Sequence, residues 1–144
     1  MKILYQGSPG AYSHLAAKEL YPDSEIISCK TFDECFVKAE EDKNSRIIIP
    51  ESNRITGNIG IEYLIFKHRL NIYAEHFYRV EHYLLGMKGA KLKDIKNVYS
   101  HAQALSQCSE FIKKNSINEN VRADTAGSAA LISNNKNKND AAIA

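Results

Sequence analysis

The sequence lacks long apolar runs, paired cysteines and blocks of like charge. No stretch approaches the roughly 20 apolar residues that a membrane helix needs, and the apolar start is too short for a signal peptide. The three cysteines, Cys29, Cys35 and Cys108, form neither a Cys-x-x-Cys pair nor a disulfide ladder. These absences predict a protein of the reducing cytoplasm without a membrane partner, in which Cys35 and Cys108 are buried thiols on apolar helix faces.

The charge balance is close to neutral, because 19 lysine and arginine residues stand against 17 aspartate and glutamate residues. A nucleic-acid binder would carry a clear basic excess, so nucleic acid is excluded as a partner. Hydrophobic residues make up 44% of the 144-residue chain. A chain of this length buries roughly 70% of its unfolded surface, which excludes disorder for most of it.

Strand-like and helix-like segments alternate in the first half of the chain. Three strand–helix units in succession predict a parallel sheet with crossover helices. The expected strands are 1–6, 25–28 and 46–49, and the expected helices are 11–20, a helix from residue 31, and 58–67. The first helix is expected to turn Tyr12, Leu15, Ala16 and Leu20 inward. The clearest helix opens at Thr31, which forms a Thr-x-x-Glu capping box with Glu34.

The pattern changes near residue 75, where two extended segments, 71–77 and 79–86, follow each other without a helix. This predicts a crossing between two α/β lobes, 1–75 and 76–144, of one domain spanning 1–144. The second lobe is expected to hold strands 95–99, 120–123 and 141–144 and helices 100–115 and 125–133. The apolar segment 141–144 predicts either an edge strand or a chain that lacks a C-terminal portion present in its relatives.

Four polar loops follow expected strands and open expected helices. They are 7–14, 50–58, 100–103 and 124–128. Ligands of α/β sheets bind beyond the carboxyl ends of strands, and helix N-termini there favour anions. Because these loops are rich in hydroxyl, amide and imidazole groups and poor in charge, they predict a site for a small carboxylated molecule. Each loop alone also fits plain capping, with Ser100 and Gln103 as a capping box and Asp124 or Thr125 as an N-cap.

Several other kinds of site are absent from the sequence. It has no phosphate loop and no dinucleotide fingerprint, so no cofactor is expected. His76 and His82 do not have the spacing of metal ligands on one helix, so no metal is expected. The histidines His14, His68, His76 and His82 are interpreted as surface or capping residues.

Four ordered blocks carry a resemblance to a known family. Tyr5–Ser13 resembles the opening block of prephenate and arogenate dehydratases, and Ser100–Cys108 is similar to the family's Ser-His-Pro-Gln-Ala-Leu-x-Gln-Cys block. Residues 124–129 resemble its Thr-Ala block, and 141–144 resemble its Ala-Ala-Ile strand. Residues 75–77 and 82–86 also match the strands that join the family's two lobes.

The resemblance implies a two-lobed α/β fold of the type II periplasmic-binding-protein class with a cleft between lobes, whose second lobe and return segment are incomplete here. It implies a carbon–oxygen lyase that converts prephenate to phenylpyruvate in phenylalanine biosynthesis, without cofactor or metal. Thr125 is then the expected catalytic hydroxyl. The expected substrate-binding residues are Ser13, Asn53, Ser100, His101 and Gln103. A homo-oligomer and the choice between prephenate and arogenate are left open.

Two departures from the family pattern bear on activity. Where the family has Pro-Ile-Glu-Asn-Ser, Ser52 replaces the glutamate and Arg54 the serine, although Asn53 matches. The family's Thr-Arg-Phe motif and the ACT domain of many relatives are expected beyond residue 144. The alternative function is therefore a catalytically weak or inactive relative that binds an aromatic keto acid or amino acid.

Overall fold

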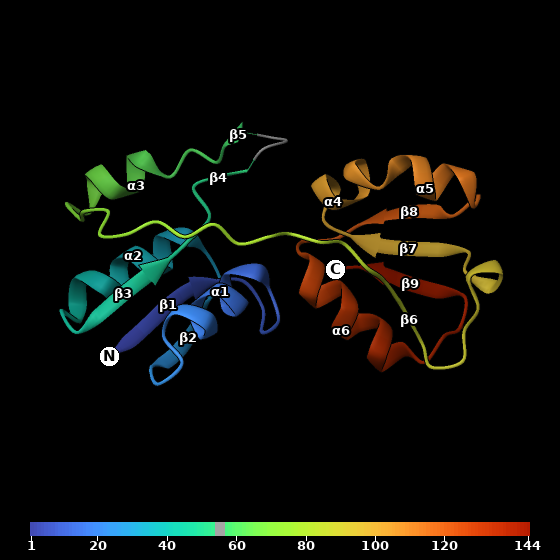
Figure 1. The fold of residues 1–144 in the computed structure, drawn as a ribbon, viewed down its shortest axis with the longest axis horizontal. Coiled ribbons are helices and arrows are strands. Elements are labelled where there is room, and N and C mark those ends of the chain that lie inside the picture. The colour runs from blue at the N-terminus through green and yellow to red at the C-terminus, as the bar shows by residue number, and fades with distance from the viewer. Residues whose placement is uncertain (54–56) are drawn as a thin grey trace. The chain divides into compact units, whose positions relative to one another are not determined.

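Two compact units make up the computed structural model of the chain, which describes residues 1–53 and 57–144. The first unit runs from Met1 to Arg79 and the second from Val80 to Ala144. Each unit has its own sheet (Figure 1). Each also has its own cluster of buried apolar residues. Within the described residues, no helix combines the length and the apolar character needed to cross a bilayer.

The main sheet of the first unit is parallel, with the strand order β2–β1–β3. Its strands are β1 (Lys2–Gln6), β2 (Glu25–Cys29) and β3 (Ser45–Ile48), connected by helices α1 (Tyr12–Leu20) and α2 (Phe32–Glu41). Successive parallel strands require crossover connections, and the helices supply them. The parallel sheet predicted from the strand–helix alternation is confirmed.

Helix α2 begins where its capping residues predict. Thr31 Oγ1 accepts a 3.1 Å hydrogen bond from the backbone N–H of Glu34. The Glu34 carboxylate accepts a 2.7 Å bond from the N–H of Lys30, one residue before the N-cap. The buried face of the helix consists of Cys35, Phe36 and Ala39, as its period predicts.

Helix α1 turns a different face to the core from the predicted one. Ala16 and Ala17 are its buried residues, whereas Leu15 is 37% and Leu20 is 41% exposed. The prediction that Leu15 and Leu20 face inward is therefore wrong. The small side chains of Ala16 and Ala17 allow the helix backbone to lie close to the sheet. The spacing of the larger apolar residues does not indicate this close packing.

The segment after β3 begins with a short hairpin rather than a helix. Strands β4 (Ser52–Asn53) and β5 (Gly57–Asn58) pair antiparallel, and helix α3 covers only Glu62–Lys67. The predicted helix over 58–67 is thus wrong in its first turn. Gly57 and Gly60 have φ values of +75° and +82°, a left-handed conformation that stops the helix from extending upstream.

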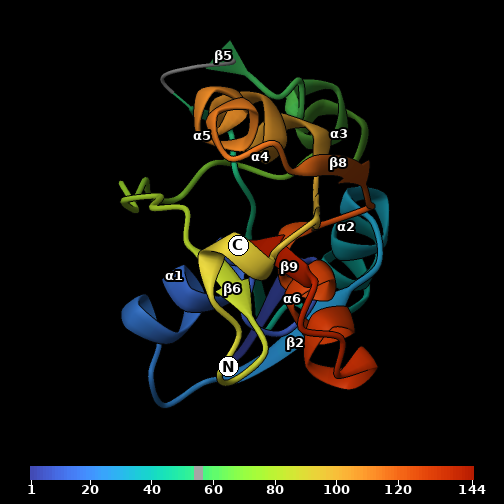
Figure 2. The ribbon, with the colours of Figure 1, turned by 90° about the vertical axis from the view of Figure 1, so that its right-hand side faces the viewer.

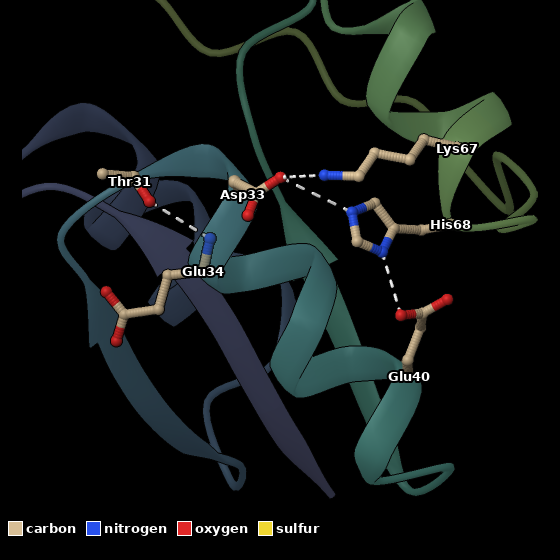
Figure 3. Close-up of polar contacts among 6 residues, drawn as sticks. All are labelled: Thr31, Asp33, Glu34, Glu40, Lys67 and His68. Atoms are coloured by element: carbon tan, nitrogen blue, oxygen red, sulfur yellow. Dashed lines mark hydrogen bonds and ion pairs between the residues drawn. The ribbon is translucent and has the colours of Figure 1, made fainter.

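Ion pairs attach the C-terminal end of α3 to α2, as Figure 3 shows. Lys67 Nζ lies 2.7 Å from Asp33 Oδ1, and His68 Nδ1 lies 2.9 Å from Glu40 Oε2. The other ring nitrogen of His68 lies 3.6 Å from Asp33. The imidazole also packs on the ring of Phe36 at a centroid distance of 5.5 Å. His68 is the C-cap residue of α3, in agreement with its interpretation as a capping residue, but it is buried and does not lie on the surface.

The second unit has a mixed sheet in the order β6–β9–β7–β8. Its strands are β6 (Leu84–Gly86), β7 (Asn97–Ser100), β8 (Asn118–Val121) and β9 (Asp140–Ile143). Strand β9 pairs parallel with β7 and antiparallel with β6, so it lies inside the sheet. The edge-strand interpretation of residues 141–144 is wrong.

Helices cover both faces of this sheet. Helices α4 (Ala102–Gln107) and α5 (Ser109–Lys114) lie on one face and α6 (Thr125–Asn135) on the other (Figure 2). A short 3₁₀ helix, η1 (Leu92–Asp94), precedes β7. The core between these layers includes Val98, Leu105, Ile112, Ile132 and Ile143.

The predicted helix over 100–115 is divided into two. Cys108 ends α4 and begins α5, and its N–H donates to the carbonyls of both Ala104 and Leu105 at 3.1 Å. Leu105 and Ile112 are buried, whereas Phe111 is 40% exposed. Helical period therefore does not relate the residues on the two sides of this break.

The two extended segments expected near residue 75 are only partly present. Residues 84–86 form β6, but the described residues 71–83 form no helix or strand. Several large apolar side chains here are exposed, among them Ile72, Tyr73 and Phe77. Apolar composition alone therefore predicts a strand over 71–77, whereas these residues form no hydrogen-bonded strand in this structure.

Candidate functional site

The polar loops lie at the carboxyl ends of parallel strands in both units. In the first unit, the loop of residues 7–11 follows β1 and the β4–β5 hairpin follows β3. In the second unit, residues 101 and 122–124 follow the neighbouring parallel strands β7 and β8. This edge of an α/β sheet is where ligands bind, as the sequence analysis assumed.

Hydrogen bonds hold the loop after β1 in place. The N–H of Gly7 donates to Cys29 O at 3.0 Å, and Ser28 Oγ donates to Gly7 O at 2.5 Å. Further along, the N–H of Ala11 donates to Ser8 O at 3.0 Å. The N–H of Gly10 donates to His14 Nδ1 at 2.9 Å. These bonds set the start of α1, the helix that carries the predicted residue Ser13.

The predicted residue Ser13 is half-buried in the first turn of α1. Asn53 lies in β4, where its backbone pairs with Gly57. The departure at Ser52 falls in the same strand, and Arg54 lies outside the described residues.

The far end of the hairpin is held by a pair of residues that sequence reasoning missed. Asn58 Oδ1 accepts a 2.5 Å hydrogen bond from the N–H of Gly60. The Asn58 amide also donates to the Glu62 carboxylate, a bond that lowers the pKa of Glu62. The Asn-x-Gly-x-Glu spacing is the local signal that would have found this turn.

Ser100 is fully buried, with no exposed surface. Its hydroxyl donates a 2.5 Å hydrogen bond to the carbonyl of Ile143, and its own carbonyl accepts a 2.8 Å bond from the N–H of Arg122. The side chain therefore joins β7 to the end of β9 inside the sheet.

His101, rather than Ser100, is the N-cap of α4. Its Nδ1 accepts a 3.3 Å hydrogen bond from the N–H of Gln103. The capping box predicted between Ser100 and Gln103 is wrong, because the Ser100 hydroxyl is bonded to β9. His101 is exposed and Gln103 half-buried, so both side chains reach the surface at the carboxyl end of β7.

Asp124 caps helix α6, in agreement with one of the two predicted caps. Its Oδ1 accepts a 2.5 Å bond from the N–H of Gly127, and its carbonyl accepts a 2.7 Å bond from Ser128 Oγ. A Cβ on residue 127 would lie 2.9 Å from Asp124 Oδ2, so glycine is needed beside the cap. Thr125 begins the helix and is half-buried.

An open depression of about 480 Å³ lies beside this cap. Its lining residues are Val121, Arg122, Ala123, Asp124, Gly127 and Ser128. Arg122 is exposed and brings a cation to the N-terminal end of α6, where the helix dipole already favours anions. Sequence reasoning missed Arg122, although a cation between a strand and a helix N-terminus is a recognisable signal for a carboxylate.

The cysteines do not provide a nucleophile. Cys29 and Cys35 are buried and Cys108 is half-buried. Burial and the neighbouring Cys29 raise the pKa of the Cys35 thiol, and burial raises that of Cys108. The predicted burial of Cys35 is confirmed. The described residues contain no group of three or more His, Cys, Asp or Glu side chains placed to hold a metal ion.

The structure thus brings His101, Gln103 and Thr125 to one edge of the second sheet, and places Ser13 and Asn53 in elements that follow β1 and β3. The predicted cleft between two lobes, in which all these residues meet, stays a prediction. The assignment of substrate contacts to them also stays a prediction.

Comparison with known proteins identifies close relatives along the whole chain. The family model described as prephenate dehydratase matches residues 3–144. The chain is 37% identical over 145 residues to arogenate dehydratase 2 of Petunia hybrida, covering all of this chain and 37% of that protein. It therefore spans little more than a third of the length of this curated relative.

Two solved structures resemble the chain over its full length. One, described as a novel type of quorum-quenching acylase, has a TM-score of 0.88 and 32% identity, with 53% of that chain covered. The other, the prephenate dehydratase of Staphylococcus aureus, has a TM-score of 0.76 and 24% identity, with 54% covered. The α/β fold class predicted from the sequence, that of type II periplasmic-binding proteins, is confirmed.

Proposed function

Because the chain belongs to the prephenate dehydratase family, we propose that it forms part of the site for the decarboxylating dehydration of prephenate or of its amino-acid counterpart, arogenate. The reaction breaks a ring carbon–oxygen bond and a carbon–carboxylate bond, releasing hydroxide and carbon dioxide while the ring becomes aromatic. The hydroxide leaves as water once it has received a proton. The proposed enzyme class is therefore a carbon–oxygen lyase.

The observation that carries this proposal is the grouping of polar residues at the carboxyl ends of β7 and β8. Arg122 supplies a fixed positive charge at the N-terminal end of α6, which suits one substrate carboxylate. His101 and Gln103 add neutral hydrogen-bonding groups at the start of α4. An anionic ring compound with a hydroxyl group matches such a set of groups.

Thr125 is the proposed catalytic hydroxyl. It lies at the first position of α6, where the helix dipole and the free N–H groups stabilise negative charge. A hydroxyl donor beside the departing hydroxide would stabilise the charge that develops in the transition state. Ser13 and Asn53 are proposed as substrate contacts of the first unit, and Ser100 is proposed to position β7.

The test is phenylpyruvate formation from prephenate, with arogenate as a parallel substrate. Thr125→Ala is expected to lower kcat about 10²–10³-fold, the typical effect of losing one such donor. Ser133→Ala removes another hydroxyl from α6, on an exposed residue outside the site, and is expected to leave kcat unchanged. Equal rates for Thr125→Ala and the parent chain would refute the role of Thr125.

Binding without turnover would instead support the alternative of a small-molecule binding module. Titration calorimetry with phenylpyruvate and with phenylalanine distinguishes a keto acid ligand from an amino acid. In that case, Arg122→Gln is expected to weaken binding about tenfold or more, since a charge-assisted hydrogen bond is lost.

A second candidate function is amide hydrolysis, which is favoured by the TM-score of 0.88 to the quorum-quenching acylase. This activity would release a free amine from an N-acyl amide. The same preparations should therefore be assayed for release of the free amine from an N-acylated amino-lactone. Amine release by Ser133→Ala at the rate of the parent, together with absence of phenylpyruvate, would favour this candidate over the dehydratase.

A further inference from the structure

The loop after β1 is closed by an imidazole rather than by a conventional capping side chain. Ala11, the N-cap of α1, makes no side-chain capping bond. Instead, the N–H of Gly10 donates to His14 Nδ1 at 2.9 Å. Gly10 has a φ of +95°, so its N–H is turned back towards the first turn of the helix by a conformation that glycine readily adopts.

The imidazole of His14 is itself held in place by an aromatic ring from the sheet. The rings of Tyr5 and His14 are stacked, with centroids 5.2 Å apart and an interplanar angle of 27°. Tyr5 lies in β1 and is 2% exposed, so it forms a rigid support. The contact of Gly10 with His14 therefore connects the loop to the sheet through one side chain.

The direction of this hydrogen bond defines the protonation state of His14. A backbone N–H is only a donor, so Nδ1 must present its lone pair and the proton must be on Nε2. An imidazolium has no acceptor, because both of its nitrogens carry protons. The contact with Gly10 can therefore exist only while His14 is neutral.

The surroundings of His14 favour the neutral ring. Burial lowers the pKa of His14, and the positive charge of Lys18, four residues later on α1, lowers it further. Tyr5 is the titratable group that faces the ring from β1. The positive end of the α1 dipole also disfavours a second proton.

We propose that His14 is a positioning residue of the candidate site, whose neutral imidazole holds the loop of residues 7–13 closed and whose protonation releases it. This inference rests on the proposed function for its consequence, because Ser13 lies where this loop enters α1. Its structural part depends only on Gly10, His14 and Tyr5.

The proposal has a defined direction with pH. In the unfolded chain His14 titrates at the ordinary histidine value of about 6.5, and in the folded chain it titrates lower. The stability contributed by the loop contact is therefore complete above that ordinary value. It is lost as the pH falls from there through the folded pKa.

Proton and nitrogen NMR of the labelled chain tests the structural part. The Gly10 amide proton is expected to shift with the same midpoint as the His14 ring, below the ordinary histidine value. Removing the neighbouring charge with Lys18→Gln should raise that midpoint. Lys43→Gln removes the charge of an exposed lysine that does not act on His14 and should leave the midpoint unchanged.

Two substitutions of the ring separate its acceptor from its packing. His14→Gln offers an amide oxygen that does not titrate, so the Gly10 amide should remain protected and become independent of pH. His14→Phe retains a ring on Tyr5 but removes the acceptor, so Gly10 amide exchange should be about five- to tenfold faster than in the parent at neutral pH. A Gly10 amide that ignores the titration of His14, or equal exchange in both variants, would overturn the proposal.

A functional measurement then tests the positioning role. The kcat/KM of the parent for prephenate should fall on the acid side with the NMR midpoint of His14, and His14→Gln should lose this acid limb while retaining activity at neutral pH. An acid limb that persists unchanged in His14→Gln would refute positioning. If no preparation turns over prephenate, the proposed function fails, while the NMR titration still decides the role of His14 in the loop.

Discussion

The hydroxyl of Ser100 donates a 2.5 Å hydrogen bond to the carbonyl of Ile143, 43 residues away in the chain. Backbone pairing between β7 and β9 runs from Asn97 with Asp140 to Tyr99 with Ala142. The side chain of Ser100 thus adds one connection beyond the last backbone pair. A residue marked by the sequence as a ligand contact is in this structure a link between two strands.

Ser100→Ala is expected to destabilise the chain by about 1–3 kcal/mol, because the Ile143 carbonyl is left buried without its donor. Urea unfolding followed by circular dichroism measures this. Ser106→Ala, on the exposed side of α4, is the matched control and should change stability by less than about 0.5 kcal/mol. Equal effects of the two substitutions would show that the Ser100 bond contributes nothing.

Gly127→Ala is expected to have opposite effects in two backgrounds. With Asp124 present, the new methyl group lies against the capping carboxylate and should cost stability, on the scale of about 0.5–2 kcal/mol for a lost cap. In an Asp124→Ala background that conflict is gone. There the alanine should stabilise α6 by up to about 1 kcal/mol, the usual gain over glycine inside a helix. A double-mutant cycle by chemical unfolding measures both, and additive effects would contradict the prediction.

The first unit is expected to lose stability in acid. Lys67 lowers the pKa of Asp33 through a hydrogen bond, and Lys2 does the same for Asp42. Their folded pKa values lie below the unfolded ones, so the stabilisation is present above pH of about 4 and is lost as the pH falls through the folded values. In the parent chain, the urea concentration at the unfolding midpoint should fall as the pH is lowered. This fall should be smaller in Lys67→Met and unchanged in Lys43→Met. Parallel curves for both variants would rule out the Asp33 pair as a source.

Exposed aromatic residues of the first unit predict self-association at high concentration. Phe66 is 87% and Phe77 is 88% exposed, and exposed apolar surface promotes association. The double variant Phe66→Ser/Phe77→Ser should lower the weight-average mass in sedimentation velocity. Leu92→Ser, a similar change in the second unit, is the control. A strictly monomeric parent would contradict the prediction and close the question of a homo-oligomer that the sequence left open.

Features fixed by neighbours in sequence were predicted well. Helix α2 follows from the bond between Thr31 and Glu34 and from the period of its buried residues, all within one helix. The polar loops were located correctly because a strand followed by a helix N-terminus can be recognised locally. Asp124 was one of the two residues predicted to cap α6, because a capping residue can also be recognised from its neighbours in sequence.

Features fixed by distant contacts were not predicted. The inward face of α1 depends on how closely Ala16 and Ala17 approach the sheet. The burial of His68 requires Asp33 and Glu40 on another helix. No periodicity of the segment around His68 contains that information.

The position of β9 sets an order for folding during synthesis. Strand β9 is made after β6, β7 and β8, yet it lies between β6 and β7, and among the described residues β6 pairs with no other strand. The three strands β1, β2 and β3 of the first unit have all been made once Ile48 has been added to the chain. The second sheet must wait for Ile143, because β6 ends at Gly86 and β7 at Ser100, well before their shared partner β9 begins at Asp140. During that interval both strands lack their partner and are open to association with other chains.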